Sequence, residues 1–337
     1  MTTMKAWLLK SRPVGVPTQD NWEMGEMPVP TADEGEYVAE TLFLSIDPYM
    51  RGRMNDAKSY AAPVPIGGIM EGGTVGRVIE SKSDRVPVGS YVLGQGGWAT
   101  HWKAPGKLAT LVDADTAPLS SYVGMLGMPG MTAWAGLHNI GKPQEGETLC
   151  VAAATGPVGS MVGQIAKAKG LRAVGIAGGT DKCAFAVDEL GFDACLDRND
   201  PDLAAKLKEA TPNGIDIYWE NVGGPVFETV WPRLNPFSRV PVCGVIHHYN
   251  ATEVPMGENW GPRIFRDILT KRILVKGFIV WDYGEQQSQF VEEIVPLIKQ
   301  GAIKVREDVS EGLESAPQSL IDVLQGANFG KKVIKVA

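Results

Sequence analysis

The chain has 337 residues, which is long enough for two domains with sizeable hydrophobic cores. Its net charge of −7 argues against a nucleic-acid-binding or anionic-membrane surface, and no run of about 18 apolar residues predicts a membrane-spanning helix. The 4 cysteines are scattered along the chain, so we expect a cytoplasmic protein without a disulfide framework.

Residues 1–125 are predicted to form an all-β domain of barrel or sandwich type. Short apolar segments alternate with turns rich in Gly and Pro, and helical periodicity is nearly absent. The expected strands are 4–10, 36–46, 72–81, 89–95, 98–104 and 108–112. Asp47-Pro48 follows one of these strands and marks a turn that continues into Tyr49.

Near residue 120 the pattern changes to helices and then to alternating strands and helices. Two helices are expected between 120 and 141, with a break at Pro129-Gly130. The expected strands that follow are 149–154, 171–177, 194–196, 214–220, 238–246 and 273–280. The helices expected between and after them lie at 158–169, 184–190, 201–210, 224–234, from 265, and at 286–300. This alternation predicts a doubly wound parallel sheet over residues 126–302.

The C-terminal tail is expected to return to the first domain. It contains a possible strand at 303–306, a helix at 316–325 and a last strand at 332–336 that has the character of an edge strand. The predicted domains are therefore 1–125 together with 303–337, and 126–302.

Residues 148–182 have the order strand, glycine turn, helix, strand, which is typical of a dinucleotide site. Gly156 permits the tight turn, Gly159 lets the backbone approach a pyrophosphate, and Gly163 permits close packing of the helix. The N–H groups at the helix start would bind the phosphates. An ordinary strand–helix connection is the alternative, but strands on both sides favour nucleotide binding.

The end of the second strand favours NADPH over NADH. Gly178 stands where NAD sites usually carry an acid, and Lys182 offers a cation to a 2′-phosphate. Asp181 would then cap the following helix. Arg198, at the neighbouring strand end, could supply a second cation or be a solvated surface residue.

Asn221, Cys243 and Gly244 follow two further predicted strands, at positions from which they could contact a cofactor. The alternative for each is a turn residue, and position alone does not decide between the two.

No metal site is expected, because no Cys and His residues have the spacing of a zinc site and residues 1–125 contain no cysteine. Hydride transfer to an alkene conjugated with a carbonyl needs only hydrogen-bond donors for the enolate. Tyr249, just past a strand end, and Tyr49, in the turn of the β domain, are candidate donors. Either could instead be a half-buried tyrosine with its hydroxyl at the surface.

Several segments taken together resemble the zinc-independent medium-chain dehydrogenase/reductase superfamily. They are LSIDPYMRGRM, LGMPGMTAW, VAAATGPVGSMVGQIAKAKG, AGGTDK, IDIYWENVGG, VCGVIHHYN, KGFIV and GANFGKKVIKV. Within it the chain is most similar to prostaglandin reductases, leukotriene B4 dehydrogenases, 2-alkenal reductases and bacterial curcumin reductases. The resemblance implies a GroES-like β-barrel domain, a Rossmann domain and a homodimer.

The resemblance also implies roles for residues of this chain. Tyr249 would bind the substrate carbonyl or supply a proton, and Tyr49 would contact the substrate. Lys182 would hold the 2′-phosphate, and a tyrosine that other members place near this phosphate falls close to Arg198. The remaining implied cofactor contacts are Gly156, Pro157, Val158 and Gly159 at the pyrophosphate, and Asn221, Cys243, Gly244, Val245, Ile246, Tyr249, Phe278, Ile279, Val280 and Asn328 at the nicotinamide.

These observations predict an NADPH-dependent reductase of the C=C bond in α,β-unsaturated ketones and aldehydes. Loops 54–66 and 250–262 would line the substrate pocket. Two alternatives stay open: a quinone reductase of the same superfamily, and an NADPH-binding protein without activity.

Overall fold

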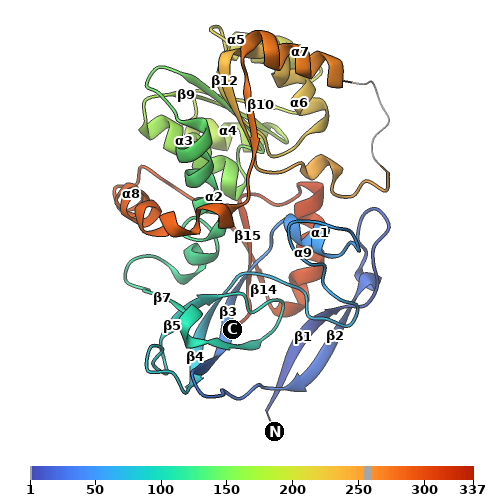
Figure 1. Cartoon of the computed structure of the whole chain (residues 1–337), viewed down its shortest axis with the longest axis vertical. Helices are drawn as coiled ribbons and strands as arrows, with labels where there is room; N and C mark the ends of the chain where they lie inside the picture. The colour runs from blue at the N-terminus through green and yellow to red at the C-terminus, as the bar shows by residue number, and fades with distance from the viewer. Residues whose placement is uncertain (1, 254–259) are drawn as a thin grey trace. The chain divides into compact units, whose positions relative to one another are not determined.

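The computed structural model describes residues 2–253 and 260–337 and divides the chain into two compact units (Figure 1). The first unit contains Met1–Gly127 and Glu307–Ala337, and the second contains Met128–Arg306. The chain therefore leaves the first unit once and returns to it for its last segment.

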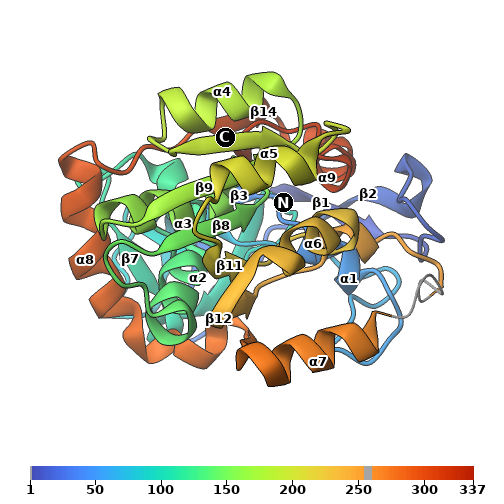
Figure 2. The same cartoon turned by 90° about the horizontal axis from the view of Figure 1, so that it is seen from above.

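Within the described residues, the second unit is built on a 6-stranded parallel sheet in the order β10-β9-β8-β11-β12-β13. The strands are β8 (Thr148–Ala152), β9 (Arg172–Ala177), β10 (Ala194–Asp197), β11 (Ile215–Trp219), β12 (Leu234–Val242) and β13 (Leu274–Gly277). Figure 2 shows β9, β8, β11 and β12 in this succession. If the six strands are numbered in chain order from β8, their order in the sheet is 3-2-1-4-5-6. This is the order of a doubly wound dinucleotide-binding sheet, so the predicted sheet is confirmed.

The direction of winding reverses between β8 and β11. Ligands of such sheets bind at this reversal, beyond the carboxyl ends of the strands. The central strands are apolar because both faces of the sheet are covered there, as in β8, where all residues are buried.

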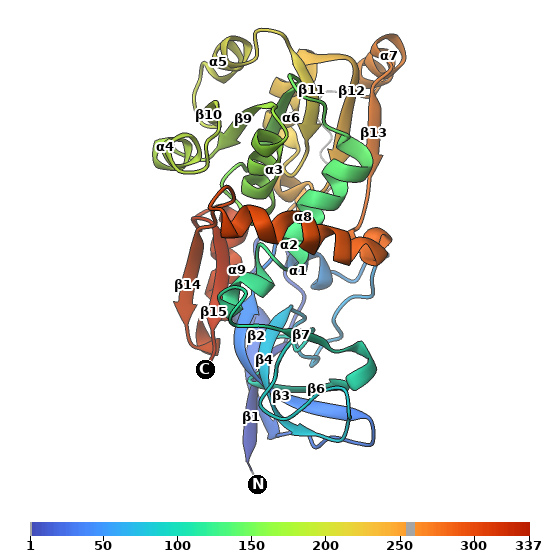
Figure 3. The same cartoon turned by 90° about the vertical axis from the view of Figure 1, so that its left-hand side faces the viewer.

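The helices of the second unit are α2 (Met128–Gly136), α3 (Pro157–Ala168), α4 (Thr180–Asp188), α5 (Leu203–Ala210), α6 (Gly224–Val230), α7 (Gly261–Lys271) and α8 (Gln287–Lys299). α2 packs against α3 and α8, which Figure 3 shows together, while α5 packs against α6. α3 buries Met161, Val162 and Ile165 along one side, which is the stripe that its sequence period predicts.

The first unit contains a 7-stranded sheet in the order β14-β15-β3-β4-β5-β7, with β6 paired to β3, and a separate pair β1-β2. Its elements are β1 (Thr3–Leu9), β2 (Trp22–Pro28), β3 (Glu36–Ser45), α1 (Tyr49–Arg53), β4 (Thr74–Ser81), β5 (Tyr91–Gly94), β6 (His101–Pro105), β7 (Thr110–Val112), β14 (Glu307–Glu311), α9 (Ala316–Gln325) and β15 (Lys331–Lys335). β15 pairs antiparallel with β3. Leu320 and Ile334 of the tail join Leu44 and Trp98 in one core cluster.

Several sequence-based boundaries are wrong. The strand expected at 303–306 lies at Glu307–Glu311, and the break expected at Pro129-Gly130 falls inside the first turn of α2, where proline is tolerated. β2 was not expected at all, because its sequence WEMGEMP contains Gly and Pro and little apolar alternation. Within the described residues, none of the helices has the length and apolarity needed to cross a membrane.

Candidate functional site

The turn after β8 has the shape of a phosphate cradle. α3 begins at Pro157, with Gly156 as its N-cap residue and no side chain capping its first turn. The first-turn N–H groups of a helix have no carbonyl partner within the helix, so they can donate to an anion. Gly159 cannot carry a side chain here, since an added Cβ would lie 2.2 Å from the carbonyl oxygen of Ala153. The predicted residues Gly156, Pro157, Val158 and Gly159 therefore form a turn that fits a pyrophosphate.

Gly163 permits the close packing of α3 that the sequence predicts. α3 packs on β8 and β9 of the sheet. An added Cβ at Gly163 would lie 1.9 Å from Cζ of Phe192, and an added Cβ at Gly175 of β9 would lie 3.2 Å from Cδ1 of the same ring. The glycine therefore accommodates an aromatic ring that also contacts the sheet.

The end of β9 places one of the two predicted cations beside Gly178. The guanidinium of Arg198 lies against this glycine: an added Cβ there would be 3.2 Å from the Arg198 Nε. Lys182 lies in the first turn of α4, the helix that follows β9. The position of Arg198 at the strand end fits a contact with a 2′-phosphate.

Asp181 does not cap α4, contrary to the sequence-based prediction. The helix begins at Thr180 with Gly179 at the N-cap, so Asp181 lies in the first turn, where a negative charge interacts favourably with the helix dipole. Asp197, which the sequence analysis gave no role, orders this region instead. Its Oδ1 accepts the Gly179 N–H at 2.9 Å, and backbone donors hold the pKa of this carboxyl below its usual value.

Asn221 joins the two strands between which the winding reverses. Its Nδ2 donates to the carbonyl oxygen of Ala152 at the end of β8 (2.8 Å), and its Oδ1 accepts from Nε1 of Trp219 at the end of β11 (3.0 Å). The side chain is thus held rigidly at the carboxyl edge of the sheet, where the predicted nicotinamide contact would be made.

Glu220 is a site-region residue that the sequence analysis missed. Its buried carboxylate accepts the Gly223 N–H (2.8 Å), the Val222 N–H and the Tyr218 hydroxyl (2.9 Å). Burial raises the pKa of Glu220, and these donors oppose the rise. Its carbonyl oxygen accepts the Cys243 N–H (2.9 Å), so one residue ties the end of β11 to the end of β12.

The segment that carries Tyr249 follows β12. The strand was expected at 238–246, but it lies at Leu234–Val242, and the next two N–H groups, of Cys243 and Gly244, both donate to the one carbonyl oxygen of Glu220. The predicted residues Cys243, Gly244, Val245 and Ile246 therefore form the turn beyond the strand. Burial raises the pKa of Cys243 to about 12.

The Tyr249 hydroxyl lies over Gly244. An added Cβ at Gly244 would be 3.0 Å from the Tyr249 oxygen. The two preceding histidines pack on the β11–α6 turn: an added Cβ at Gly224 would meet the His247 ring at 2.5 Å, and one at Gly223 would meet the His248 ring at 3.2 Å. The structure thus brings Tyr249 to the carboxyl edge of the sheet, near the turn that Glu220 holds.

The predicted residues after β13 complete this edge. Phe278 is buried edge-on against Trp219, with ring centroids 5.8 Å apart. Ile279 N–H donates to Asp282 Oδ2 at 3.1 Å, and Val280 begins the short helical turn that follows. The observed strand β13 is shorter than the strand expected at 273–280, since it ends at Gly277.

The remaining predicted site residues lie in the first unit. Tyr49 begins α1, and burial, with Asp47 as the next cause, raises the pKa of Tyr49 above its usual 10.0, so its phenol stays protonated. The guanidinium of Arg53 lies 5.5 Å from the centre of the Tyr49 ring. Asn328 donates to the carbonyl oxygen of Gly330 at 2.8 Å.

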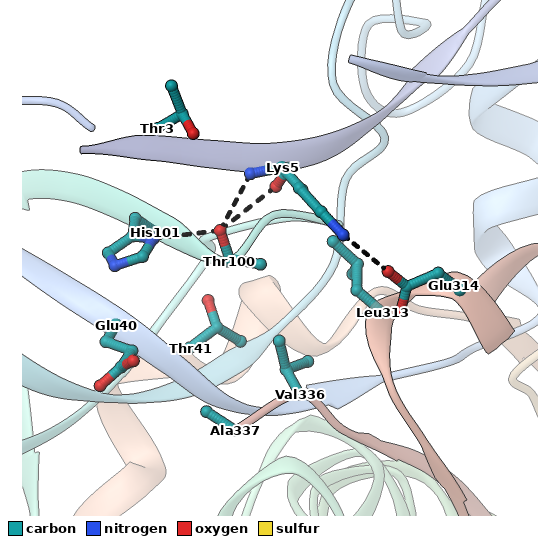
Figure 4. Close-up of a pocket in the computed structure, with 10 residues that line it drawn as sticks. All are labelled: Thr3, Lys5, Glu40, Thr41, Thr100, His101, Leu313, Glu314, Val336 and Ala337. Carbon is teal, nitrogen blue, oxygen red and sulfur yellow. Dashed lines mark hydrogen bonds and ion pairs between the residues drawn. The ribbon is translucent and has the colours of Figure 1, made fainter. Parts of the chain in front are cut away.

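A pocket of about 360 Å³ also lies in the first unit (Figure 4). It is lined by Thr3, Lys5, Glu40, Thr41, Thr100, His101, Leu313, Glu314, Val336 and Ala337. Lys5 pairs with Glu314 at 3.2 Å across it. None of the predicted site residues lines this pocket.

Of the second substrate loop, 250–262, residues 254–259 lie outside the described residues. In the part of the chain that is described, no group of three or more His, Cys, Asp or Glu could hold a metal ion.

Comparison with known proteins decides the family. Residues 5–112 match the family described as N-terminal domain of oxidoreductase, and residues 157–300 match that described as zinc-binding dehydrogenase. The chain is 51% identical over 335 residues to the NADPH-dependent curcumin reductase of Escherichia coli (strain K12), across 99% of this chain and 97% of that protein. The chain belongs to the medium-chain dehydrogenase/reductase superfamily. Its fold is accordingly a GroES-like domain plus a Rossmann domain, as the resemblance predicted.

Two further comparisons place this medium-chain dehydrogenase/reductase within the predicted group. It is 38% identical to the 2-alkenal reductase (NADP(+)-dependent) of Nicotiana tabacum over 339 residues, covering 99% of this chain and 97% of that protein. The crystal structure of CurA from Vibrio vulnificus in complex with NADPH has a TM-score of 0.95 and 46% identity, with 99% of both chains covered. The predicted family membership is confirmed.

Proposed function

We propose that this chain is an NADPH-dependent reductase of the C=C bond of α,β-unsaturated ketones and aldehydes. The observation that carries the proposal is the Tyr249 hydroxyl over Gly244, at the edge of the sheet where the dinucleotide cradle also lies. The names of the relatives support it, since they include an NADPH-dependent curcumin reductase and a 2-alkenal reductase.

Cofactor binding is assigned to the second unit and substrate contacts in part to the first. The α3 N–H groups bind the pyrophosphate, while Lys182 and Arg198 bind the 2′-phosphate. Asn221, the Cys243–Ile246 turn and the Phe278–Val280 segment enclose the nicotinamide. Asn328 remains a proposed cofactor contact and Tyr49 a proposed substrate contact. The proposed domain limits remain 1–125 with 303–337, and 126–302.

NADPH, when bound, supplies a hydride to the β-carbon of the substrate. Tyr249 donates a hydrogen bond to the carbonyl oxygen, on which negative charge develops as the enolate forms. Tyr249 or a water then delivers a proton to the α-carbon. Tyr49 positions the substrate through its protonated phenol.

The proposal is tested by mixing the purified protein with NADPH and a panel of simple enones and following the loss of NADPH absorbance. Tyr249→Phe is expected to lower kcat about 100-fold or more, because it removes the donor to the enolate, while NADPH affinity stays within about twofold. The matched control is Tyr91→Phe in β5, which is expected to leave both unchanged. Wild-type rates in Tyr249→Phe would contradict the assignment.

The preference for NADPH is tested separately. Removing a charged donor to a phosphate costs about 1.5–3 kcal/mol, so Lys182→Ala is expected to raise the Kd for NADPH about 10- to 100-fold. Its Kd for NADH, which lacks the 2′-phosphate, should not change. Equal weakening for both cofactors would contradict the role of Lys182.

We further propose a homodimer in the cytoplasm. β13 forms one end of the sheet, and its Leu274 and Val275 are 47% and 41% exposed. Trp281 beside it is 65% exposed. Unpaired strand edges with apolar side chains readily pair with another chain. Light scattering of the wild type and of Val275→Lys tests this, with a dimer expected for the first and a monomer for the second.

A further inference from the structure

A single buried carboxylate shapes the turn that follows β11. Glu220 is 2% exposed, and its Oε1 accepts the N–H groups of Val222 and Gly223, the second at 2.8 Å. Its Oε2 accepts the Tyr218 hydroxyl at 2.9 Å. Hydrogen bonds to an ionised acceptor are stronger than bonds between neutral groups. The side chain therefore fixes the path of the backbone over residues 220–223, which we call the 220–223 turn.

The carbonyl groups of the 220–223 turn hold the segment 243–249, which carries Tyr249. Four N–H groups of this segment donate to three consecutive carbonyl oxygens of the turn. The pairs are Cys243 to Glu220 (2.9 Å), Gly244 to Glu220 (3.2 Å), Ile246 to Asn221 (3.2 Å) and His247 to Val222 (2.9 Å). Figure 3 shows β11 beside β12, the two strands that precede the turn and the segment. The path of the turn therefore sets the path of the segment.

The Tyr249 residue is tied to this arrangement at both ends. Its N–H donates to the carbonyl oxygen of Ile246 at 3.2 Å, and the Ile246 N–H is itself held by the turn. Its hydroxyl lies over Gly244. An added Cβ at Gly244 would be 3.0 Å from the Tyr249 hydroxyl oxygen and 3.5 Å from the Asn221 carbonyl oxygen. A change in the shape of the turn would therefore move the hydroxyl.

Asn221 belongs to the same turn, but its side chain has supports of its own. The amide bonds to the Ala152 carbonyl oxygen and to Nε1 of Trp219, and neither bond involves the Glu220 carboxylate. We therefore expect loss of the carboxylate to displace Tyr249 more than the Asn221 amide.

We propose that Glu220 is a positioning residue for Tyr249. Its carboxylate holds the 220–223 turn in the shape that places the Tyr249 hydroxyl for its hydrogen bond to the substrate carbonyl oxygen. The inference rests on the proposed function for the role of Tyr249. A displacement of about 1 Å in a reacting geometry can lower the rate about 100-fold, even when the altered residue touches neither substrate nor cofactor. Loss of Glu220 should therefore lower kcat and leave cofactor affinity nearly unchanged.

The test compares variants of Glu220 in turnover of a simple enone with NADPH. Glu220→Met fills a similar volume without a strong acceptor and should lower kcat about 30-fold, with the Kd for NADPH within about threefold. Glu220→Ala serves as a second variant without an acceptor. Glu220→Gln keeps an oxygen for the two N–H groups of the turn, and its kcat should stay within about fivefold of the wild type.

The matched control is Glu147→Met in the same unit. Glu147 pairs with Arg239 at 2.6 Å, so its loss also removes a partly buried carboxylate, but one that does not contact the 220–223 turn. This variant should keep the wild-type kcat. An equal loss of kcat in both variants would mean that general destabilisation lowers the rate, and would overturn the proposal.

Two further measurements separate positioning from a purely structural role. In a Tyr249→Phe background, Glu220→Met should lower kcat by a further factor of less than about three, because the hydroxyl through which it acts is absent. Hydrogen exchange of a peptide covering residues 243–249 should be about tenfold faster in Glu220→Met than in the wild type or Glu220→Gln.

The proposal is overturned if Glu220→Met and Glu220→Ala keep the wild-type kcat, or if their effect is undiminished in the Tyr249→Phe background. It is also overturned if the 243–249 peptide exchanges at the wild-type rate in these variants. A failure of the proposed function would appear differently, as no turnover of any enone by the wild type. The exchange measurement would then still decide whether Glu220 holds the segment that carries Tyr249.

Discussion

The buried ion pair beneath the Tyr49 turn is expected to dominate the stability of the first unit. Lys331 Nζ lies 3.0 Å from Asp47 Oδ1, with the two side chains 0% and 5% exposed. Lys331 also donates to the carbonyl oxygen of Ile46 at 2.8 Å, and Ser45 donates to the other oxygen of Asp47. We predict that Asp47→Asn strongly destabilises the protein, since it leaves a buried ammonium group without its counter-charge.

The magnitude follows from burial. Removing one partner of a buried pair costs about 3–5 kcal/mol of unfolding free energy. At about 2–4 °C per kcal/mol, the thermal midpoint falls by about 6–20 °C. The control is Glu311→Gln in β14. Its pair with Lys335 is 3.7 Å long and 75% and 47% exposed, so it should cost about 1 kcal/mol or less.

The stability loss caused by Asp47→Asn should depend on pH, and the direction follows from the pKa of Lys331. Burial lowers the pKa of Lys331 from its usual 10.5, and Asp47 opposes that shift. In Asp47→Asn the pKa falls further, so the folded protein binds fewer protons than the unfolded chain over a wider range below 10.5. Stability then rises with pH in that range, and the difference in stability from the wild type should narrow as the pH rises toward 10.5.

The assay is urea unfolding, followed by circular dichroism, of the wild type, both single variants and Asp47→Asn with Lys331→Met. The double variant should recover part of the loss, because it removes the unpaired charge. The reasoning is refuted if Asp47→Asn is no less stable than Glu311→Gln, or if the double variant is as unstable as Asp47→Asn alone.

Two further substitutions test close approaches. Gly244→Ala places a methyl group 3.0 Å from the Tyr249 hydroxyl and should lower kcat about tenfold with little change in NADPH affinity, whereas Gly284→Ala, with nothing within 4 Å of the added Cβ, should change neither. An unaltered kcat in Gly244→Ala would show that the hydroxyl position is unimportant. Gly163→Ala forces a Cβ to within 1.9 Å of the Phe192 ring and should cost about 1–3 kcal/mol in urea unfolding. A loss below about 0.5 kcal/mol would mean that the ring moves aside freely.

The turn between β8 and α3 could be predicted because sequence features close to it specify its structure. An apolar strand, a glycine turn and an amphipathic helix occur within one short stretch, and each favours the same structure. The end of β12 could not be predicted in this way. The sequence VCGVI continues the apolar pattern past Val242. The N–H groups of Cys243 and Gly244, however, donate to the carbonyl oxygen of Glu220, which belongs to another part of the sequence.

Side chains that act over long sequence separations were missed for the same reason. Asp47 and Lys331 are 284 residues apart, and no local pattern joins them. Glu220 could have been found from the sequence, because it directly follows a mostly apolar strand. A carboxylate at such a position is buried and needs hydrogen-bond donors.

The most direct test of the proposed function is the fate of the transferred hydrogen. The protein is incubated with a simple enone and NADPH that carries deuterium at C4 of the nicotinamide, on each face in turn, and the product is analysed by NMR and mass spectrometry. We predict a saturated ketone with one deuterium on the β-carbon from one of the two labelled cofactors. An allylic alcohol with deuterium on the former carbonyl carbon, or an unlabelled and unreduced enone, would contradict it.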